Sequence, residues 1–278
     1  MYPGKVTFVL DRPQSADNLG AAARVLMNFG LERLSVVAPP SWAGPPRGGG
    51  PGTAAEDVLR RARTLARKAS GLLEGAEIHR DLAAAVAGAT WVCGTSSRTI
   101  EGRPRLSPRA LAAEVRARAA HGEVALVFGQ ERRGLSDAEL ELCHAICSIP
   151  TAPAYDSMNL AQAVAVVAYE LAAAAPPEGR AASPGAGAAG GVLPPGAPRA
   201  RGDEPARHAT VEALWARLRA LLSGAGFLNP QNPEHILADF RRLLARAEPT
   251  QREVELLVAA ARALERELRE RAPPEGRD

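Results

Sequence analysis

The stretch VALVFGQERRGL, residues 124–135, joins an apolar run to a charged loop that is bounded by glycines. Five consecutive apolar residues, Val124 to Phe128, are typical of a strand buried on both faces, as strands of parallel sheets are. Ligands of such sheets bind where the strands end. The loop with Gly129, Glu131 and Gly134 is therefore a candidate binding segment. It contains neither the dinucleotide fingerprint nor the Walker phosphate loop.

The flanking sequence repeats this alternation of strand and helix through residue 150. Gly30 is a stop signal for the first predicted helix, and Asp17 or Ser15 is its expected N-cap. Alternating elements of this kind predict an α/β domain with a mostly parallel sheet covered on both faces. We expect strands at residues 5–10, 34–37, 91–94, 124–128 and 143–149, and helices at residues 16–29, 56–69, 81–87, 108–120 and 137–142.

The second half of the chain is predicted to be helical, with an interruption. An Ala-rich helix spans about residues 159–175, and a Gly/Pro/Ala stretch after it has too few large apolar groups to pack. Apolar residues then recur at helical spacing in three segments separated by Pro230, Pro233 and Pro249. We predict a first domain at residues 1–175, a flexible linker at 176–208 and a small all-α domain at 209–278. The last region has 11 Arg against 11 Asp plus Glu, so its charges fit either an RNA-binding surface or a solvated, dimer-supporting one.

Composition narrows the function classes. The chain has 278 residues, 46% hydrophobic, with a net charge of +3 and a pI near 9.0. No apolar run approaches the ~20 residues of a membrane helix, and the start lacks a secretory signal pattern, so we expect a cytoplasmic protein. Cys93, Cys143 and Cys147 are too few for a disulfide framework, and no fourth ligand is evident for a metal. The basic residues are almost all arginine, which suits phosphate binding but also fits a GC-rich genome.

Two further motifs lie at helix starts. Asn18-Leu19-Gly20-Ala21-Ala22-Ala23-Arg24 opens the first helix, where small residues permit close approach of a backbone or ligand and the N-terminus can hold a phosphate. A segment from Ile149 to Ala165 enters the helix at residues 159–175. Ser157 or Asn159 is the expected cap of that helix. The alternation of polar and small residues at the start of the helix favours a functional role for the segment.

Taken in order, the three motifs resemble those of the SpoU branch of the SPOUT RNA methyltransferases. The matching segments are the asparagine–arginine helix start, the Phe-Gly-x-Glu-x-x-Gly-Leu loop and the Ser-x-Asn-Leu segment, within about residues 5–172. The tail is similar to that of the TrmJ type within this branch, at Gly226-Phe227, Asn232-Pro233, Arg241-Arg242-Leu243, Arg246-Ala247 and Pro249. The segment from Gly94 to Arg98 also looks like TrmJ-type enzymes.

The resemblance implies a fold whose C-terminal part forms a deep trefoil knot, a rare chain topology. It also implies that S-adenosylmethionine (SAM) binds bent in the knot and that a homodimer partner completes the active site. Asp156 departs from a commoner serine, and a carboxylate there either helps to hold the cationic cofactor or points to solvent. The implied cofactor-binding positions are Thr95, Ser96, Ser97, Gly129, Gly134, Ile149, Asp156, Ser157 and Met158.

The implied activity is SAM-dependent methylation of a ribose 2′-oxygen in tRNA, at nucleotide 32 of the anticodon stem-loop. Arg24 is the key residue of the family. Because a guanidinium with a pKa above about 12 rarely gives up its proton, gripping phosphate or orienting the hydroxyl is an easier role for it than accepting a proton. Asn18 is expected to hold the RNA backbone, Glu131 to orient Arg24 or a nearby loop, and Ser157 and Asn159 to lie near the ribose. A ribosomal RNA substrate and a non-catalytic RNA-binding protein are the alternatives.

Overall fold

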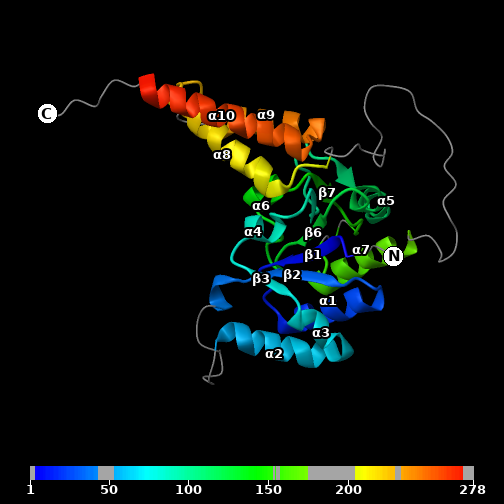
Figure 1. Cartoon of the computed structure of the whole chain (residues 1–278). Helices are drawn as coiled ribbons and strands as arrows, with labels where there is room; N and C mark the ends of the chain where they lie inside the picture. The colour runs from blue at the N-terminus through cyan, green and yellow to red at the C-terminus, as the bar shows by residue number, and fades with distance from the viewer. Residues whose placement is uncertain are drawn as a thin grey trace, which may run out of the picture. The chain divides into compact units, whose positions relative to one another are not determined.

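The computed structural model describes residues 4–42, 53–152, 154, 157–174, 204–228 and 233–271. The chain divides into two compact units, Met1–Ala197 and Pro198–Asp278. Figure 1 shows a sheet with surrounding helices in the first unit and helices in the second. The predicted linker lies mostly outside the described residues. Among the residues that are described, no helix is long and apolar enough to cross a membrane.

The first unit is built on a parallel sheet of seven strands in the order β3-β2-β1-β6-β4-β7-β5. This confirms the predicted fold class, and the knot stays a prediction from the family resemblance. β1, β6 and β4 lie at the centre, so their carboxyl ends lie side by side. The strands are β1 (Val6–Asp11), β2 (Arg33–Val37), β3 (Glu77–His79), β4 (Trp91–Thr95), β5 (Arg105–Leu106), β6 (Val124–Phe128) and β7 (Ala145–Cys147).

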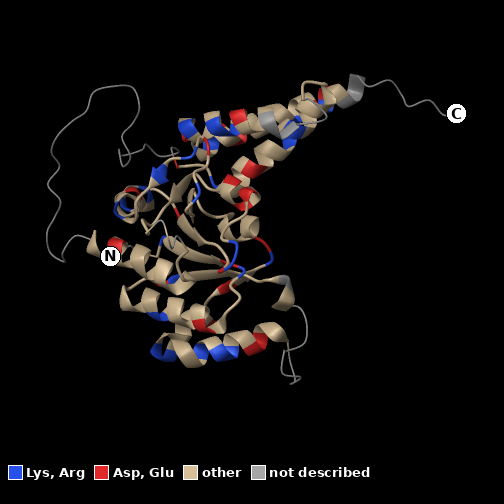
Figure 2. Cartoon of the chain, turned by 180° about the vertical axis from the view of Figure 1, so that it is seen from behind, with Lys and Arg blue, Asp and Glu red and all other residues tan. Residues whose placement is uncertain are grey.

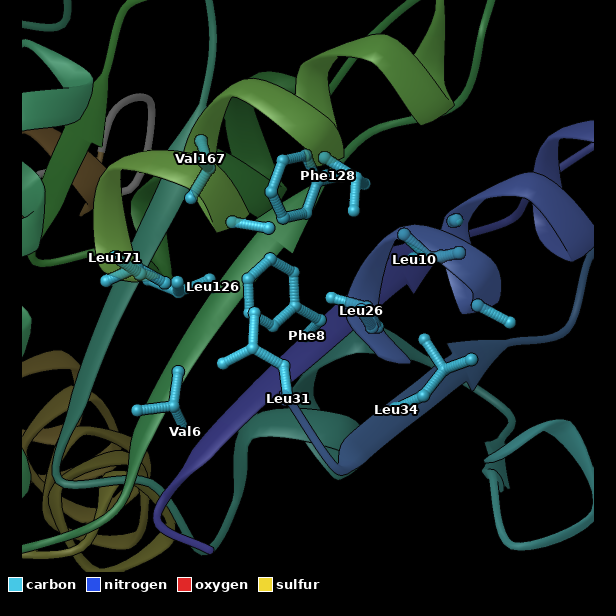
Figure 3. Packing of buried hydrophobic residues seen from close by; sticks show 14 of the residues in the cluster. Val6, Phe8, Leu10, Leu26, Leu31, Leu34, Leu126, Phe128, Val167 and Leu171 are labelled. Atoms are coloured by element: carbon cyan, nitrogen blue, oxygen red, sulfur yellow. The ribbon is translucent and has the colours of Figure 1, made fainter. Parts of the chain in front are cut away.

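Helices cover both faces of this sheet, as the alternation of elements predicted. Phe8 and Phe128 stack at 5.6 Å between ring centroids within the larger core, which also buries α1, α2, α5 and α7 (Figure 3). Val9 and Val127, one residue earlier or later along the same strands, face a smaller core with α4 and α6. The helices are α1 (Ala16–Asn28), α2 (Ala54–Ala66), α3 (Ser70–Glu74), α4 (Leu82–Val86), α5 (Pro108–Ala119), α6 (Asp137–Glu141) and α7 (Leu160–Ala173), with 3₁₀ turns at Pro40–Trp42 and Arg67–Ala69.

The second unit contains α8 (His208–Gly224), α9 (Pro233–Ala247) and α10 (Gln251–Arg271). Its core joins Leu214 of α8 to Val254 and Val258 of α10. α10 buries the stripe that packs on α8, which is narrower than the apolar face that the sequence spacing predicts. The helical spacing of the sequence places five further residues on the apolar faces of α9 and α10, but the structure leaves them exposed by 40–59%: Phe240, Leu243, Leu257, Leu264 and Leu268. Figure 2 shows basic and acidic residues mixed along these helices.

All three cysteines are free and buried in the first unit. Burial raises the pKa of Cys143 and of Cys147 to about 12, and raises that of Cys93 well above its ordinary value. A thiol is nucleophilic only as its thiolate. These side chains are therefore core residues that stay protonated at neutral pH.

We expect iodoacetamide at pH 8 to leave all three cysteines of the native protein unmodified and to alkylate all three in guanidinium chloride. Burial excludes the reagent and also suppresses the thiolate. Intact-mass measurement gives the number of added groups. Rapid modification of any of the three in the native protein would contradict this picture of the core.

Candidate active site

Side chains from the three sequence motifs meet at one place. The carboxylate of Glu131, in the loop after β6, accepts hydrogen bonds from the backbone N–H groups of Gln14 at 3.0 Å and Ser15 at 3.2 Å. It also accepts one from the Asn18 Nδ2 atom at 2.8 Å. With three N–H donors around it, the Glu131 carboxylate holds the start of α1 against the β6 loop.

Asn159 extends this network to the third motif. Its Nδ2 donates to Asn18 Oδ1 at 2.8 Å, while its Oδ1 accepts from the backbone N–H groups of Ala161 at 2.9 Å and Gln162 at 3.3 Å. Asn159 is therefore the N-cap of α7, which settles the choice between Ser157 and Asn159. One amide both caps a helix and ties that helix to α1.

The start of α1 is shaped by its own sequence. Ser15 is the N-cap, and its hydroxyl accepts from the N–H groups of Asp17 and Asn18. A Cβ on Gly20 would lie 2.5 Å from the Ala62 carbonyl oxygen. A small residue here permits the close approach of either a backbone or a ligand. At Gly20 the structure shows the first of these, because α1 packs closely on α2.

Arg24 lies on the solvent side of α1. It forms no hydrogen bond or ion pair with any residue in the described part of the chain. The structure thus leaves Arg24 outside the Asn18–Glu131–Asn159 network, with its guanidinium available to a ligand or a second protein chain.

The predicted cofactor positions follow three adjacent strands, β6, β4 and β7. Thr95 ends β4 and donates its hydroxyl to the Val127 carbonyl of β6 at 3.1 Å. The Ser96 N–H bonds to the Cys147 carbonyl of β7 at 3.0 Å. Ile149, two residues beyond β7, packs against the larger core. The ends of these strands thus form one connected edge.

The loop after β6 is a tight turn. The Gly134 N–H donates to the Gln130 carbonyl at 2.9 Å, and Gly134 has a φ of +63°. A Cβ on Gly129 would lie 2.2 Å from the Gly134 carbonyl carbon and 2.4 Å from the Leu135 nitrogen. The backbone of Gly134 and Leu135 therefore fills the space that a side chain at position 129 would need.

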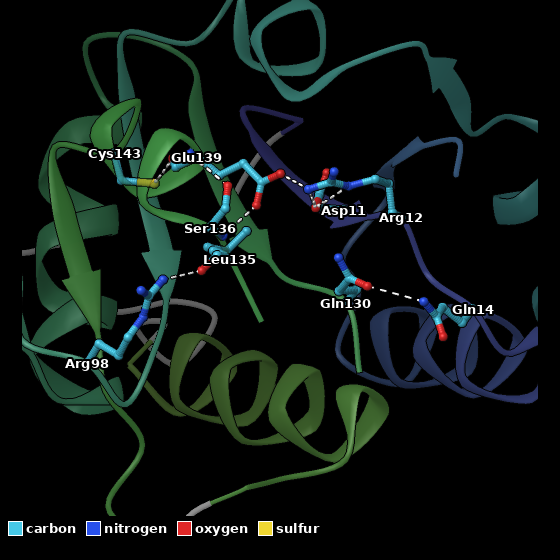
Figure 4. A network of polar contacts seen from close by, with 9 residues as sticks. All are labelled: Asp11, Arg12, Gln14, Arg98, Gln130, Leu135, Ser136, Glu139 and Cys143. Atoms are coloured by element: carbon cyan, nitrogen blue, oxygen red, sulfur yellow. Dashed lines mark hydrogen bonds and ion pairs between the residues drawn. The ribbon is translucent and has the colours of Figure 1, made fainter. Parts of the chain in front are cut away.

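Two arginines that were not among the predicted site residues connect the loops. Arg98 bonds to Asp137 Oδ1 at 2.6 Å. It also donates to the Leu135 carbonyl, which like Asp137 lies beyond the β6 loop (Figure 4). Arg105, in edge strand β5, bonds to Thr99 Oγ1 at 2.8 Å and to Ser148 Oγ at 2.6 Å. The loop after β4 is thereby joined to the segments that follow β6 and β7.

We expect Arg105→Gln to weaken SAM binding by about tenfold, because the loops after β4 and β7 lose charge-assisted hydrogen bonds worth about 1.5 kcal/mol or more. Isothermal titration calorimetry gives the SAM dissociation constant. Arg109→Gln, at an exposed position on neighbouring α5, is the matched control. A SAM affinity equal to that of the control would show that this connection does not shape the site.

A second ionic cluster lies at the carboxyl end of β1. Asp11 is buried, and its Oδ2 accepts from Arg12 Nη2 at 2.8 Å, while Arg12 also contacts the Glu139 carboxylate of α6 (Figure 4). Burial raises the pKa of Asp11, and the Arg12 guanidinium acts in the opposite direction. Arg12 has a φ of +47°, an unusual conformation for a non-glycine residue. The cluster anchors the exit of β1 to α6.

The sequence-predicted site residues thus divide into groups. Asn18, Glu131 and Asn159 are in direct contact. The strand-end positions Thr95, Ser96, Ser97, Gly129, Gly134 and Ile149 follow neighbouring strands. Ser157 is exposed and Met158 is partly buried, both immediately before Asn159. Asp156 lies outside the described residues.

Known proteins match this chain along nearly its whole length. The SpoU rRNA Methylase family matches residues 5–169, and the C-terminal domain of tRNA methyltransferase TrmJ matches residues 209–273. A "tRNA (cytidine/uridine-2'-O-)-methyltransferase TrmJ" of Yersinia enterocolitica is 33% identical over 275 residues, which cover 98% of this chain and 95% of the relative.

Two solved structures are also similar. TrmJ from Z. mobilis ZM4 has a TM-score of 0.70 at 29% identity, over 93% of this chain and 98% of that one. A putative methylase family protein from Neisseria gonorrhoeae has a TM-score of 0.59 at 32% identity, over 77% of this chain and 94% of that one. The chain therefore belongs to the SpoU methylase family and, with its matching C-terminal domain, to the TrmJ group within it.

Proposed function

We propose that this protein methylates the ribose 2′-oxygen of nucleotide 32 in the tRNA anticodon loop, with SAM as the methyl donor. SAM-dependent tRNA 2′-O-methylation follows from membership in the family. The choice of nucleotide 32 as the methylated position goes beyond what family membership gives. The observation that carries the assignment of the site is the hydrogen-bonded contact of Asn18, Glu131 and Asn159 beside the ends of β6, β4 and β7.

The strand-end residues fit a SAM site. Nothing lies within 4 Å of the place where a Cβ on Gly134 would be, so the turn after β6 leaves room there for a ligand close to the backbone, and Ile149 offers an apolar contact. We assign cofactor binding to Thr95, Ser96, Ser97, Gly129, Gly134, Ile149, Ser157 and Met158. When bound, SAM supplies a methyl group already activated by its sulfonium.

The protein's own residues then have to position the ribose and assist the loss of its proton. Glu131 is already surrounded by three N–H donors, so its proposed task is to fix Asn18 and the start of α1. Asn18 would hold the RNA backbone, and Ser157 and Asn159 would lie beside the ribose. Arg24 would grip a phosphate or orient the 2′-hydroxyl through its forked donors.

We propose that the protein works as a homodimer through a face formed by α1 and α7. Met27 is 50% exposed and Tyr169 57% exposed, and Tyr169 makes an edge-on contact with Phe29 at 6.2 Å. Large apolar side chains exposed together mark protein contact sites. Arg24 lies one turn before Met27 on the same helix, so a partner bound here would lie near Arg24. Light scattering of the purified protein tests the dimer.

The function is tested by mapping 2′-O-methylated nucleotides by mass spectrometry in tRNA from cells with and without the gene. We expect loss of the mark at nucleotide 32 alone, and its return with purified enzyme and labelled SAM. Ribosomal RNA from the same cells is the parallel sample. A missing mark in ribosomal RNA with tRNA unchanged would refute the proposed substrate, and a mark lost elsewhere in tRNA would refute the position.

A further inference from the structure

The C-terminal unit contains a cavity of about 320 Å³ between α8 and α9 that no part of the proposed catalytic site uses. Glu212, Trp215, Ala216 and Arg219 line it from α8, and Leu237 and Arg241 line it from α9. The α8 residues are spaced i, i+3, i+4 and i+7, so they lie on one face of the helix. The core contacts with α10 come instead from Leu214 and Leu218.

The cavity has an apolar, aromatic wall and a polar rim. Trp215 is only 6% exposed and Leu237 only 4% exposed. Ala216 and Arg219 are exposed on the same face of α8. A ligand entering between the helices would meet a flat indole and an aliphatic side chain inside, with charged groups around it.

Arg241 is held in place across this wall. Its guanidinium carbon lies 5.5 Å from the centre of a Trp215 ring, within the range of a cation–π contact. The same guanidinium pairs with both Glu212 carboxylate oxygens, at 3.2 and 3.4 Å. Arg219 is the second arginine of the lining.

We infer that this cavity binds one unpaired nucleotide of the RNA substrate, an inference that rests on the proposed function. Proteins read single-stranded RNA by stacking splayed bases on aromatic rings and arginine planes. The Arg241 guanidinium lying over the Trp215 indole offers such a surface, and the arginines of the lining are suitable donors to the attached phosphate. The volume lies at the lower end of the range of about 300–1,000 Å³ for small-ligand sites. The apolar wall favours a base-bearing ligand over free phosphate.

The test fills the cavity from its rim in the full-length protein. Ala216→Trp places an indole in the space, and Ala216→Leu fills it less. Ala213→Trp puts the same side chain on an exposed part of α8 that does not line the cavity. tRNA affinity is measured by filter binding at fixed salt, SAM affinity by calorimetry and folding by thermal melting. If Ala216→Trp lowers the melting temperature relative to Ala213→Trp, Ala216→Leu takes its place in the comparison.

We expect Ala216→Trp to weaken tRNA binding by about tenfold, as loss of one stacked base does, and Ala213→Trp to leave it unchanged. SAM affinity should be the same in all variants. Equal tRNA affinities in the cavity-filling and control variants would overturn the inference. Failure of the proposed function looks different: the unmodified protein would then neither bind SAM nor methylate tRNA.

Discussion

Arg24→Ala should lower methyl transfer to tRNA by at least about 100-fold, the loss typical of removing one donor from a developing charge. Its affinity for SAM should stay within about twofold of the unmodified protein, since loss of a full binding contact costs more. The reason is structural: Arg24 is exposed and makes no hydrogen bond or ion pair with the described residues that would hold the fold or the cofactor loops. Transfer of labelled methyl groups and SAM calorimetry measure the two effects separately.

Arg61→Ala is the matched control for Arg24. Arg61 is an exposed arginine on α2 and likewise has no hydrogen bond or ion pair within the described segments. Arg24→Lys keeps the charge but loses the planar fork, so it should restore only part of the activity if the fork orients a phosphate or hydroxyl. Turnover by Arg24→Ala close to that of Arg61→Ala would remove Arg24 from the proposed mechanism.

The sheet could be predicted because its central strands are continuous apolar runs. β1 and β6 lie between helices on both faces, so their residues are buried at nearly every position. The edge strands gave no such signal. β3 has an exposed Ile78 and only three residues, and β5 consists of Arg105 and Leu106 alone. Their pairing depends on neighbours in space that periodicity along the chain does not reveal.

The site was predictable in the same uneven way. Asn18 and Asn159 stand out at helix starts and Glu131 in the loop after β6, and the parallel sheet brings the loops after β1 and β6 to its carboxyl edge. Arg98 and Arg105 look like ordinary surface charges in an arginine-rich chain, and only the folded structure shows which carbonyls and hydroxyls they meet. The Asp11–Arg12–Glu139 cluster is equally invisible, since Glu139 is more than 120 residues from the adjacent Asp11 and Arg12 along the chain.

Gly129→Ala should abolish measurable SAM binding, weakening it by at least about 100-fold, because the added carbon would overlap backbone that cannot move aside alone. The nearest atoms are the Gly134 carbonyl carbon at 2.2 Å and the Leu135 nitrogen at 2.4 Å. Relief requires the whole turn to open, and overpacking of this kind costs about 1–3 kcal/mol or more. The shift would also carry Glu131 away from Gln14, Ser15 and Asn18, so that activity falls even at high SAM concentration.

Two other glycines separate steric overlap from backbone conformation. Gly71 in α3 has nothing within 4 Å of an added Cβ and no positive φ, so Gly71→Ala should bind SAM normally. Gly134 has the same open space but a φ of +63°, so Gly134→Ala adds only a conformational cost of about 1–2 kcal/mol. The expected order of SAM affinity is therefore Gly71→Ala, then Gly134→Ala, then Gly129→Ala. If Gly129→Ala bound SAM as well as Gly71→Ala, the turn after β6 would have no part in holding the cofactor.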